Sequence, residues 1–243
     1  MEAPIWGLVR LSIGYVLLDR GGLASFMHRL QGRTPWGKTR PIFWFARKLT
    51  PLQRRVQSDL WRLADHRVLG RKLPKLLETA LPDGFTYLNV GHSNLSERTL
   101  SAVEAHPNTR ITIMIHDTIP LDYPEYTRAS AVPRFHGLLT RTLHHADLIL
   151  CNTAKTQEDV QRHMAAIARE EAEEETGETP EDDDAIIEAL PRMTVAHLAI
   201  DPPRPDEIAL PPGLPTDRPL FLSVGKSEPR KNHALLIDIW EDP

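Results

Sequence analysis

The sequence predicts an α/β fold with a Rossmann-like parallel sheet. Two observations support this prediction: apolar runs of strand length recur through the middle of the chain, and stretches of helical period separate them. The first two of these strands begin about 25 residues apart, which fits a βαβ unit. With 243 residues and 41% hydrophobic content, the chain can bury a core of ordinary size.

The composition excludes several classes of protein. A net charge of −4 does not steer the whole chain toward nucleic acid or membrane. The one cysteine, Cys151, lies in an apolar run and cannot form an internal disulfide, which fits a reducing cytoplasm. No apolar run approaches the roughly 18 residues of a membrane span, and no signal peptide pattern opens the chain. The scattered histidines give no zinc-type spacing, so we predict no metal.

The first 28 residues contain two short apolar runs, at 5–9 and 16–18, followed by Gly21-Gly22. We interpret the glycine pair as a turn rather than as a loop that approaches a phosphate. From Gln57 to Leu81 the apolar residues recur at steps of three and four, which predicts helix with interruptions at Gly70 and Pro74.

Residues 29–75 form a basic stretch with thirteen Lys and Arg against two Asp and Glu, interleaved with aromatic residues. Three interpretations are open: a solvated helical face whose aromatic rings pack inward, a membrane-surface contact, and a nucleic-acid contact. We favour the first, and the absence of a recognised nucleic-acid-binding module argues against the third.

The middle of the chain gives the clearest elements. Strands are expected at 85–90, 110–115, 147–151 and 193–198, and helices at 95–105 and 135–146. A further helix is expected to run through Met164, with Thr156 and Asp159 forming a capping box at its start. Residues 118–131 form a polar loop that contains Pro120 and Pro124. Eleven acidic residues and no basic residue lie between Glu170 and Glu188, so we expect 169–188 to be a mobile insertion or a solvated helix extension.

The C-terminal part of the chain begins a second unit. The proline density across 199–219 indicates an interdomain linker after an N-terminal domain of residues 1–198. A strand at 220–225, a polar loop and an apolar helix to Trp240 follow. One strand and one helix cannot close a core, so the second domain, 220–243, is expected to be incomplete.

Two segments carry candidate chemistry. The strand at 110–115 ends in His116 and Asp117, at the edge where ligands of open α/β sheets bind. A structural interpretation has equal weight: His116 is a hydrogen-bonded histidine that closes the strand, and Asp117 forms a turn. Farther along, Asn232 is expected to cap the last helix, which places Arg230 and Lys231 at its positive end. A phosphate or diphosphate between them would stabilise these two cations; the alternative interpretation is that both side chains simply point to water.

Four segments in order resemble one known family. They are 116–125, with His116-Asp117-Thr118-Ile119-Pro120; 146–153, with Ala146-Asp147; 198–201, Leu-Ala-Ile-Asp; and 224–233, with Glu228-Pro229-Arg230-Lys231-Asn232-His233. Together they are similar to glycosyltransferase family 4, also called glycosyl transferase group 1, of the GT-B fold. The likeness covers about residues 85–243.

The resemblance implies two Rossmann-like domains facing each other, and a retaining transferase that takes a nucleotide-sugar as substrate and needs no metal or other cofactor. Gly225, Arg230 and Lys231 would bind the donor diphosphate. His116 and Asp117 would be catalytic. Gly91 and His92, at the end of the neighbouring strand, would contact the acceptor, a polysaccharide or lipid-linked glycan, at the cytoplasmic side of a membrane.

Some features depart from the family. The chain has Gly225-Lys226 where the family usually has Gly-Thr, and the opening strand with its glycine loop is not evident. The Glu pair that grips the donor would lie past Pro243, so we expect this chain to be a fragment without turnover. The alternative function is a non-catalytic module that binds a membrane surface or a protein through residues 29–75.

Overall fold

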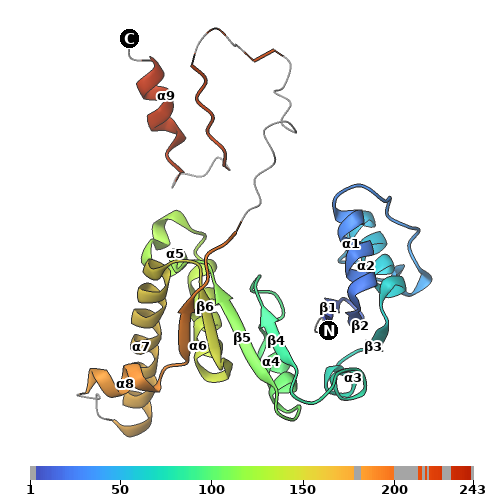
Figure 1. Ribbon diagram of the computed structural model, residues 1–243, viewed down its shortest axis with the longest axis horizontal. Coiled ribbons are helices and arrows are strands. Elements are labelled where there is room, and N and C mark those ends of the chain that lie inside the picture. The colour runs from blue at the N-terminus through green and yellow to red at the C-terminus, as the bar shows by residue number, and fades with distance from the viewer. Residues whose placement is uncertain are drawn as a thin grey trace.

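The computed structural model describes residues 4–177, 182–199, 213–214, 217, 219–225 and 231–241 (Figure 1). Two sheets organise these residues. An antiparallel sheet has the order β1 (Gly7–Leu11), β2 (Gly14–Leu18), β3 (His66–Leu69). A parallel sheet has the order β4 (Thr86–Asn89), β5 (Arg110–Ile115), β6 (Leu148–Cys151), β7 (Arg192–Val195). The α/β class and the parallel sheet are therefore confirmed, and the antiparallel sheet was not predicted.

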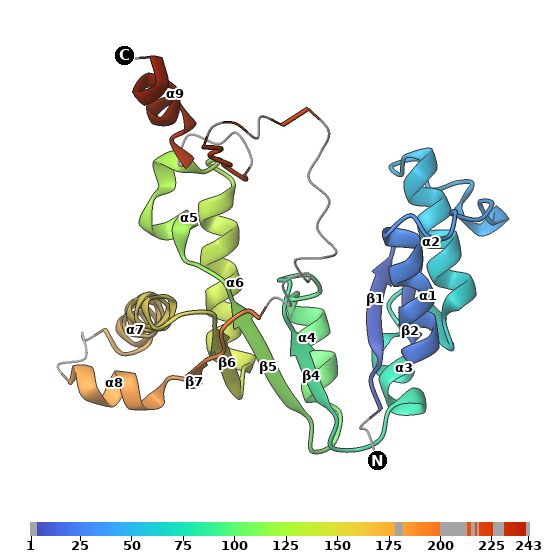
Figure 2. The ribbon, with the colours of Figure 1, turned by 45° about the horizontal axis from the view of Figure 1, so that its top comes forward.

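Helices connect and flank the strands (Figure 2). Those in the antiparallel unit are α1 (Arg20–Leu30), the short 3-10 helix η1 (Pro41–Phe43) and α2 (Pro51–Leu63). Those around the parallel sheet are α3 (Leu73–Ala80), α4 (Glu97–Glu104), α5 (Ile119–Asp122), η2 (Pro124–Tyr126), α6 (Ala131–His145), α7 (Ala154–Thr176) and α8 (Asp183–Ala189). Near the C-terminus lies α9 (His233–Glu241). None of the helices in the described ranges combines the length and apolar character needed to cross a bilayer.

The central strand β5 carries the main core. Ile111, Ile113 and Ile115 alternate along it and pack with residues of α4, α6 and α7, because successive side chains of a strand point to opposite faces. Cys151 on β6 is part of the same core, and burial raises its pKa to about 11.

The wholly buried strand β2 joins this core to a second one. Tyr15 and Leu17 face the parallel-sheet core, whereas Val16 and Leu18 face a cluster formed with α2 and η1. The two-residue period of a strand therefore lets β2 contribute to both cores at once.

Several predictions about the N-terminal half are wrong. The helix expected from Gln57 to Leu81 is two helices separated by β3, because His66–Leu69 finds an antiparallel partner in β2. Gly21-Gly22 is the first turn of α1, not a separate turn. Asp19 caps that helix by accepting from Gly22 N at 2.7 Å. Gly22 also packs so closely that a Cβ there would lie 2.7 Å from the Leu63 carbonyl oxygen.

The strands predicted from 85 to 151 and the helices between them are confirmed within a few residues, but three details differ. The predicted polar loop 118–131 contains α5 and η2. The N-cap of α7 is Thr153, whose hydroxyl accepts from Thr156 N at 3.0 Å; Asp159 instead contacts Lys155 and Arg162. The last strand, β7, is shorter than predicted.

The acidic segment and the C-terminal segment give mixed outcomes. As far as Thr176, the acidic residues extend α7 into solvent, one of the two expected forms. Most of the linker 199–219 lies outside the described residues. The predicted strand at 220–225 has no regular structure, since a strand requires a hydrogen-bonding neighbour and the described residues provide none there. Helix α9 is confirmed.

A buried carboxylate holds the antiparallel unit together. The Asp59 side chain on α2 is only 3% exposed. It accepts from Arg29 Nε on α1 at 3.1 Å, from Gly37 N in the following loop at 2.8 Å, and from Arg62 one turn along α2. One carboxylate thus satisfies donors from α1, from the loop after it and from α2, and these directional bonds fix the three segments relative to one another.

We expect Asp59→Ala to lower the free energy of unfolding by about 3 kcal/mol, because it leaves two guanidinium groups and a backbone N–H without their partner. Urea denaturation measures the change. Asp65→Ala is the matched control: this carboxylate is half exposed and pairs with His66 alone among the described residues, so its removal should cost less than about 0.5 kcal/mol. Equal losses from both substitutions would contradict the role assigned to Asp59.

Candidate functional site

The two histidines predicted for the site lie together at the carboxyl edge of the parallel sheet. His116 directly follows β5, and His92 lies in the loop after the neighbouring strand β4. Their ring centroids are 5.4 Å apart. Parallel strands end at the same edge, so adjacency of β4 and β5 is sufficient to bring these residues into contact.

Backbone carbonyls fix both imidazole rings. His92 Nε2 lies 2.8 Å from the Met114 carbonyl oxygen, and His116 Nε2 lies 2.7 Å from that of Val90. A carbonyl oxygen only accepts, so Nε2 donates in each ring and carries the proton. In the neutral form, each ring then has Nδ1 as a hydrogen-bond acceptor, and neither Nδ1 has a partner within the described residues.

The environment favours the neutral form of His92. Burial lowers its pKa below the usual value of 6.5, since desolvation disfavours the charged ring, and the neighbouring His116 acts in the same direction. The Met114 hydrogen bond and the charge of Asp117 oppose this shift without cancelling it. His92 is therefore an acceptor at neutral pH rather than a cation.

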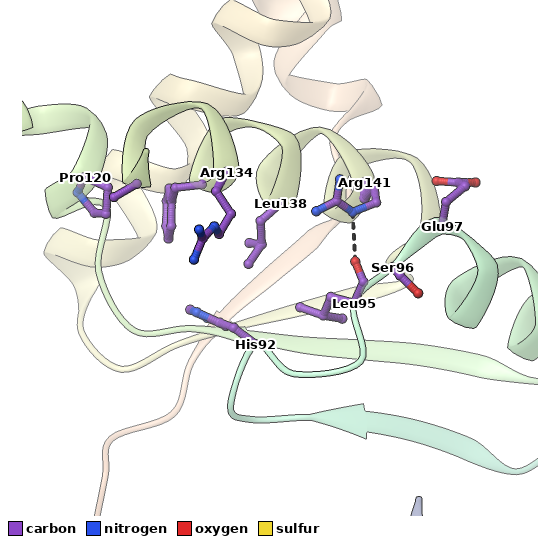
Figure 3. A pocket seen from close by; sticks show the side chains of 10 residues that line it. His92, Leu95, Ser96, Glu97, Pro120, Arg134, Leu138 and Arg141 are labelled. Carbon is purple, nitrogen blue, oxygen red and sulfur yellow. Dashed lines mark hydrogen bonds between the residues drawn. The ribbon is translucent and has the colours of Figure 1, made fainter. Parts of the chain in front are cut away.

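A hollow of about 590 Å³ lies beside His92, between α6 and the loop that leads from β4 to α4 (Figure 3). Its apolar wall includes Leu95, Pro120, Phe135 and Leu138. The Phe135 ring stands edge-on to the His92 ring, with centroids 6.2 Å apart. A cavity of this size, mostly apolar with a few polar groups, has the dimensions of a small-molecule site.

Two arginines of α6 complete the hollow, and sequence reasoning missed both. Arg134 extends from the helix toward His92, as Figure 3 shows. Arg141 donates from Nε to the Leu95 carbonyl oxygen at 2.8 Å and so fixes the wall. Their spacing of seven, with Leu138 between them, places all three on one helix face. That pattern was readable in the sequence, although it does not by itself distinguish a site from a solvated face.

The remaining acceptor-side candidates lie at the same edge with weaker roles. Asp117 is exposed, and its Oδ1 accepts from Ile119 N at 3.2 Å, which is the turn-forming contact of the structural interpretation. Gly91 is exposed and its neighbourhood is open. Neither residue lines the hollow.

The donor-side candidates are not brought to this hollow, whose lining residues all lie between His92 and Arg141. Gly225 and Lys231 are exposed in the C-terminal segment, and Arg230 lies outside the described residues. Asn232 adopts a left-handed conformation, with φ 47°. Its position directly before α9 is the predicted one, and its carbonyl oxygen accepts from Leu235 N at 3.1 Å, although its backbone is not in the extended form usual for capping residues.

Within the described ranges, no group of three His, Cys, Asp or Glu side chains is placed to hold a metal ion. The histidines at the sheet edge illustrate the reason. The bond from each Nε2 to a backbone carbonyl is one that metal-ligating histidines also make, but no third ligand side chain joins the pair within the described part of the chain.

The helical turn after Asp117 is anchored by Asp122. This carboxylate at the end of α5 accepts from the Thr118 hydroxyl, from Arg162 at 2.7 Å and from His163 at 2.8 Å, so it ties α5 to α7. Burial alone would raise the pKa of Asp122, but these three donors outweigh it and lower the pKa to about 2. Because Pro120 in α5 lines the hollow, the Asp122 contacts fix one of its walls.

We expect Asp122 to stabilise the fold above about pH 4 and to lose this effect as the pH falls toward 2. Its pKa is depressed in the folded state, so the folded state gains stability while the carboxylate is ionised and loses it on protonation. Asp122→Asn should therefore cost about 1 to 2 kcal/mol at pH 7 and much less at pH 2.5, measured by urea denaturation at both values. A cost that is independent of pH would contradict this assignment.

Comparisons of the chain with protein-family models, with curated proteins and with solved structures give no significant match.

Proposed function

We propose that this protein takes part in the transfer of a sugar from a nucleotide-sugar donor to a glycan or lipid-linked acceptor. The observation that carries the proposal is the histidine pair at the sheet edge. His92 and His116 lie with their ring centroids 5.4 Å apart, each is fixed through Nε2 and retains Nδ1 as an acceptor, and His92 lines a hollow with an apolar wall. Sugars offer hydroxyl donors on an apolar ring face, which is the pattern that such a site complements.

In this proposal the sheet edge is the sugar-binding side. Nδ1 of each histidine accepts from a sugar hydroxyl, and Arg134 donates to an anionic or carbonyl group of the same ligand. His116, closest to the end of β5, faces the transferred sugar, and Asp117 orients the acceptor hydroxyl. These groups supply positioning and proton acceptance, the two contributions needed when a hydroxyl attacks an anomeric carbon.

The donor side of the proposal rests on the resemblance described above. The Gly225 backbone, Arg230 and Lys231 would neutralise the diphosphate as the bond to the sugar breaks, which requires no metal. The alternative, a non-catalytic module, predicts no affinity of the sheet edge for sugars.

Ligand-observed NMR of the full chain with a panel of oligosaccharides and nucleotide-sugars tests the proposal. We expect saturation transfer to sugar protons, and His116→Ala should weaken binding about 3- to 10-fold, the cost of one neutral hydrogen bond. His28→Ala, at an exposed histidine of α1, should leave binding unchanged. Absence of saturation transfer from every sugar in the panel, or equal weakening by both substitutions, would refute the proposal.

A further inference from the structure

The loop between η1 and α2 displays two large aromatic side chains to solvent. Phe45 is 85% exposed and Trp44 is 59% exposed, and the aliphatic side chains of Ile42 and Leu52 nearby are also exposed. Apolar residues scattered singly over a surface need no explanation, but adjacent rings at the tip of one loop form a patch that water solvates poorly.

The loop is ordered and cannot simply turn these rings inward. Phe43, immediately before them, is fully buried and packs edge-on to Trp61, with ring centroids 6.4 Å apart. The turn after Phe43 is closed by bonds from Ala46 N and Arg47 N to the Phe43 and Phe45 carbonyl oxygens. With one aromatic residue anchored in the core, the next two are held outward.

The loop ends in a well-defined helix start. Thr50 and Gln53 form a capping box, in which each side chain accepts from the backbone of the other, and Pro51 opens α2. The loop is thus fixed at both ends, and its exposed rings are a permanent feature of the surface.

The sequence on both sides of this tip is rich in cations and contains no acid. Nine Lys and Arg and no Asp or Glu lie between Arg20 and Ser58. Some of these cations serve the fold: Arg29 pairs with Asp59, and Arg54 and Arg55 donate to backbone carbonyls. Those closest to the tip, Arg40, Arg47 and Lys48, are exposed and have no side-chain partner within the described residues.

The combination identifies the class of partner. Exposed rings together with aliphatic side chains can enter the headgroup region of a bilayer, and unpaired cations attract anionic lipids. Single-stranded nucleic acid also binds cations and rings, but aliphatic side chains such as Ile42 and Leu52 provide no stacking surface for bases. We propose that the loop 40–49, with Trp44 and Phe45 at its tip, docks this protein on an anionic lipid bilayer.

This contact is independent of the sugar site. It uses the antiparallel unit, whereas the histidine pair lies at the edge of the parallel sheet (Figure 1). It also refines the basic stretch 29–75: the surface in question is one loop, and the arginines of α2 that hold the loop in place are part of the fold.

Cosedimentation of the full chain with vesicles tests the proposal, using phosphatidylcholine alone and phosphatidylcholine with about one-third phosphatidylglycerol. We expect binding only to the anionic vesicles. Replacing two cations by R47Q/K48Q should weaken it about 25-fold, at roughly 1 kcal/mol per cation near the surface. The double variant W44S/F45S should weaken vesicle binding at least about tenfold. Lipids with brominated acyl chains should quench part of the tryptophan fluorescence of the wild type, and the Trp44→Phe variant should lose this quenching.

Matched variants separate docking from bulk charge and from hydrophobicity in general. R71Q/K72Q removes the same charge near the start of α3, and Y123S/Y126S removes a contacting pair of half-exposed rings beside α5. Both should leave vesicle binding within about twofold. Equal weakening by R71Q/K72Q and R47Q/K48Q, no binding to anionic vesicles, or binding of single-stranded RNA in preference to vesicles would each overturn the proposal.

Discussion

The burial of β5 is the constraint on which the rest of the structure depends. Every residue from Ile111 to Ile115 is buried, and its three isoleucines form the contact surface for α4, α6 and α7. A strand of this kind can carry ionisable residues only where it ends. His116 and Asp117 therefore lie at the carboxyl edge, and the parallel neighbour β4 delivers His92 to the same edge.

Sequence reasoning succeeded where one local pattern decides the structure. The run Arg110–Ile115 has no turn former, so strand, burial and the position of His116 all followed from it. It failed where tertiary pairing decides. The apolar residues in and around His66–Leu69 have helical spacing, but this segment forms a strand because it pairs with β2. The segment 220–225 shows the converse, a strand-like sequence without a neighbour in the described chain.

The same distinction explains the candidate site. The meeting of His92 and His116 was predictable because both follow strands of one parallel sheet. The contributions of Arg134, Phe135 and Arg141 were not, because they depend on how α6 is rotated about its axis. That rotation is set by Leu138 and Leu139 entering the core and by the Arg141 contact with the Leu95 carbonyl. The sequence at 131–145 shows which residues share a helix face, but which face meets the loop between β4 and α4 is a property of packing.

Cys151 gives the sheet a consequence for chemistry at the bench. It is the sole thiol of the chain, it is fully buried on β6, and its raised pKa keeps it protonated. A thiol-selective reagent can therefore attack only after β6 has separated from its cover. The rate of Cys151 alkylation would therefore measure how often the parallel sheet opens, without the need for an introduced label.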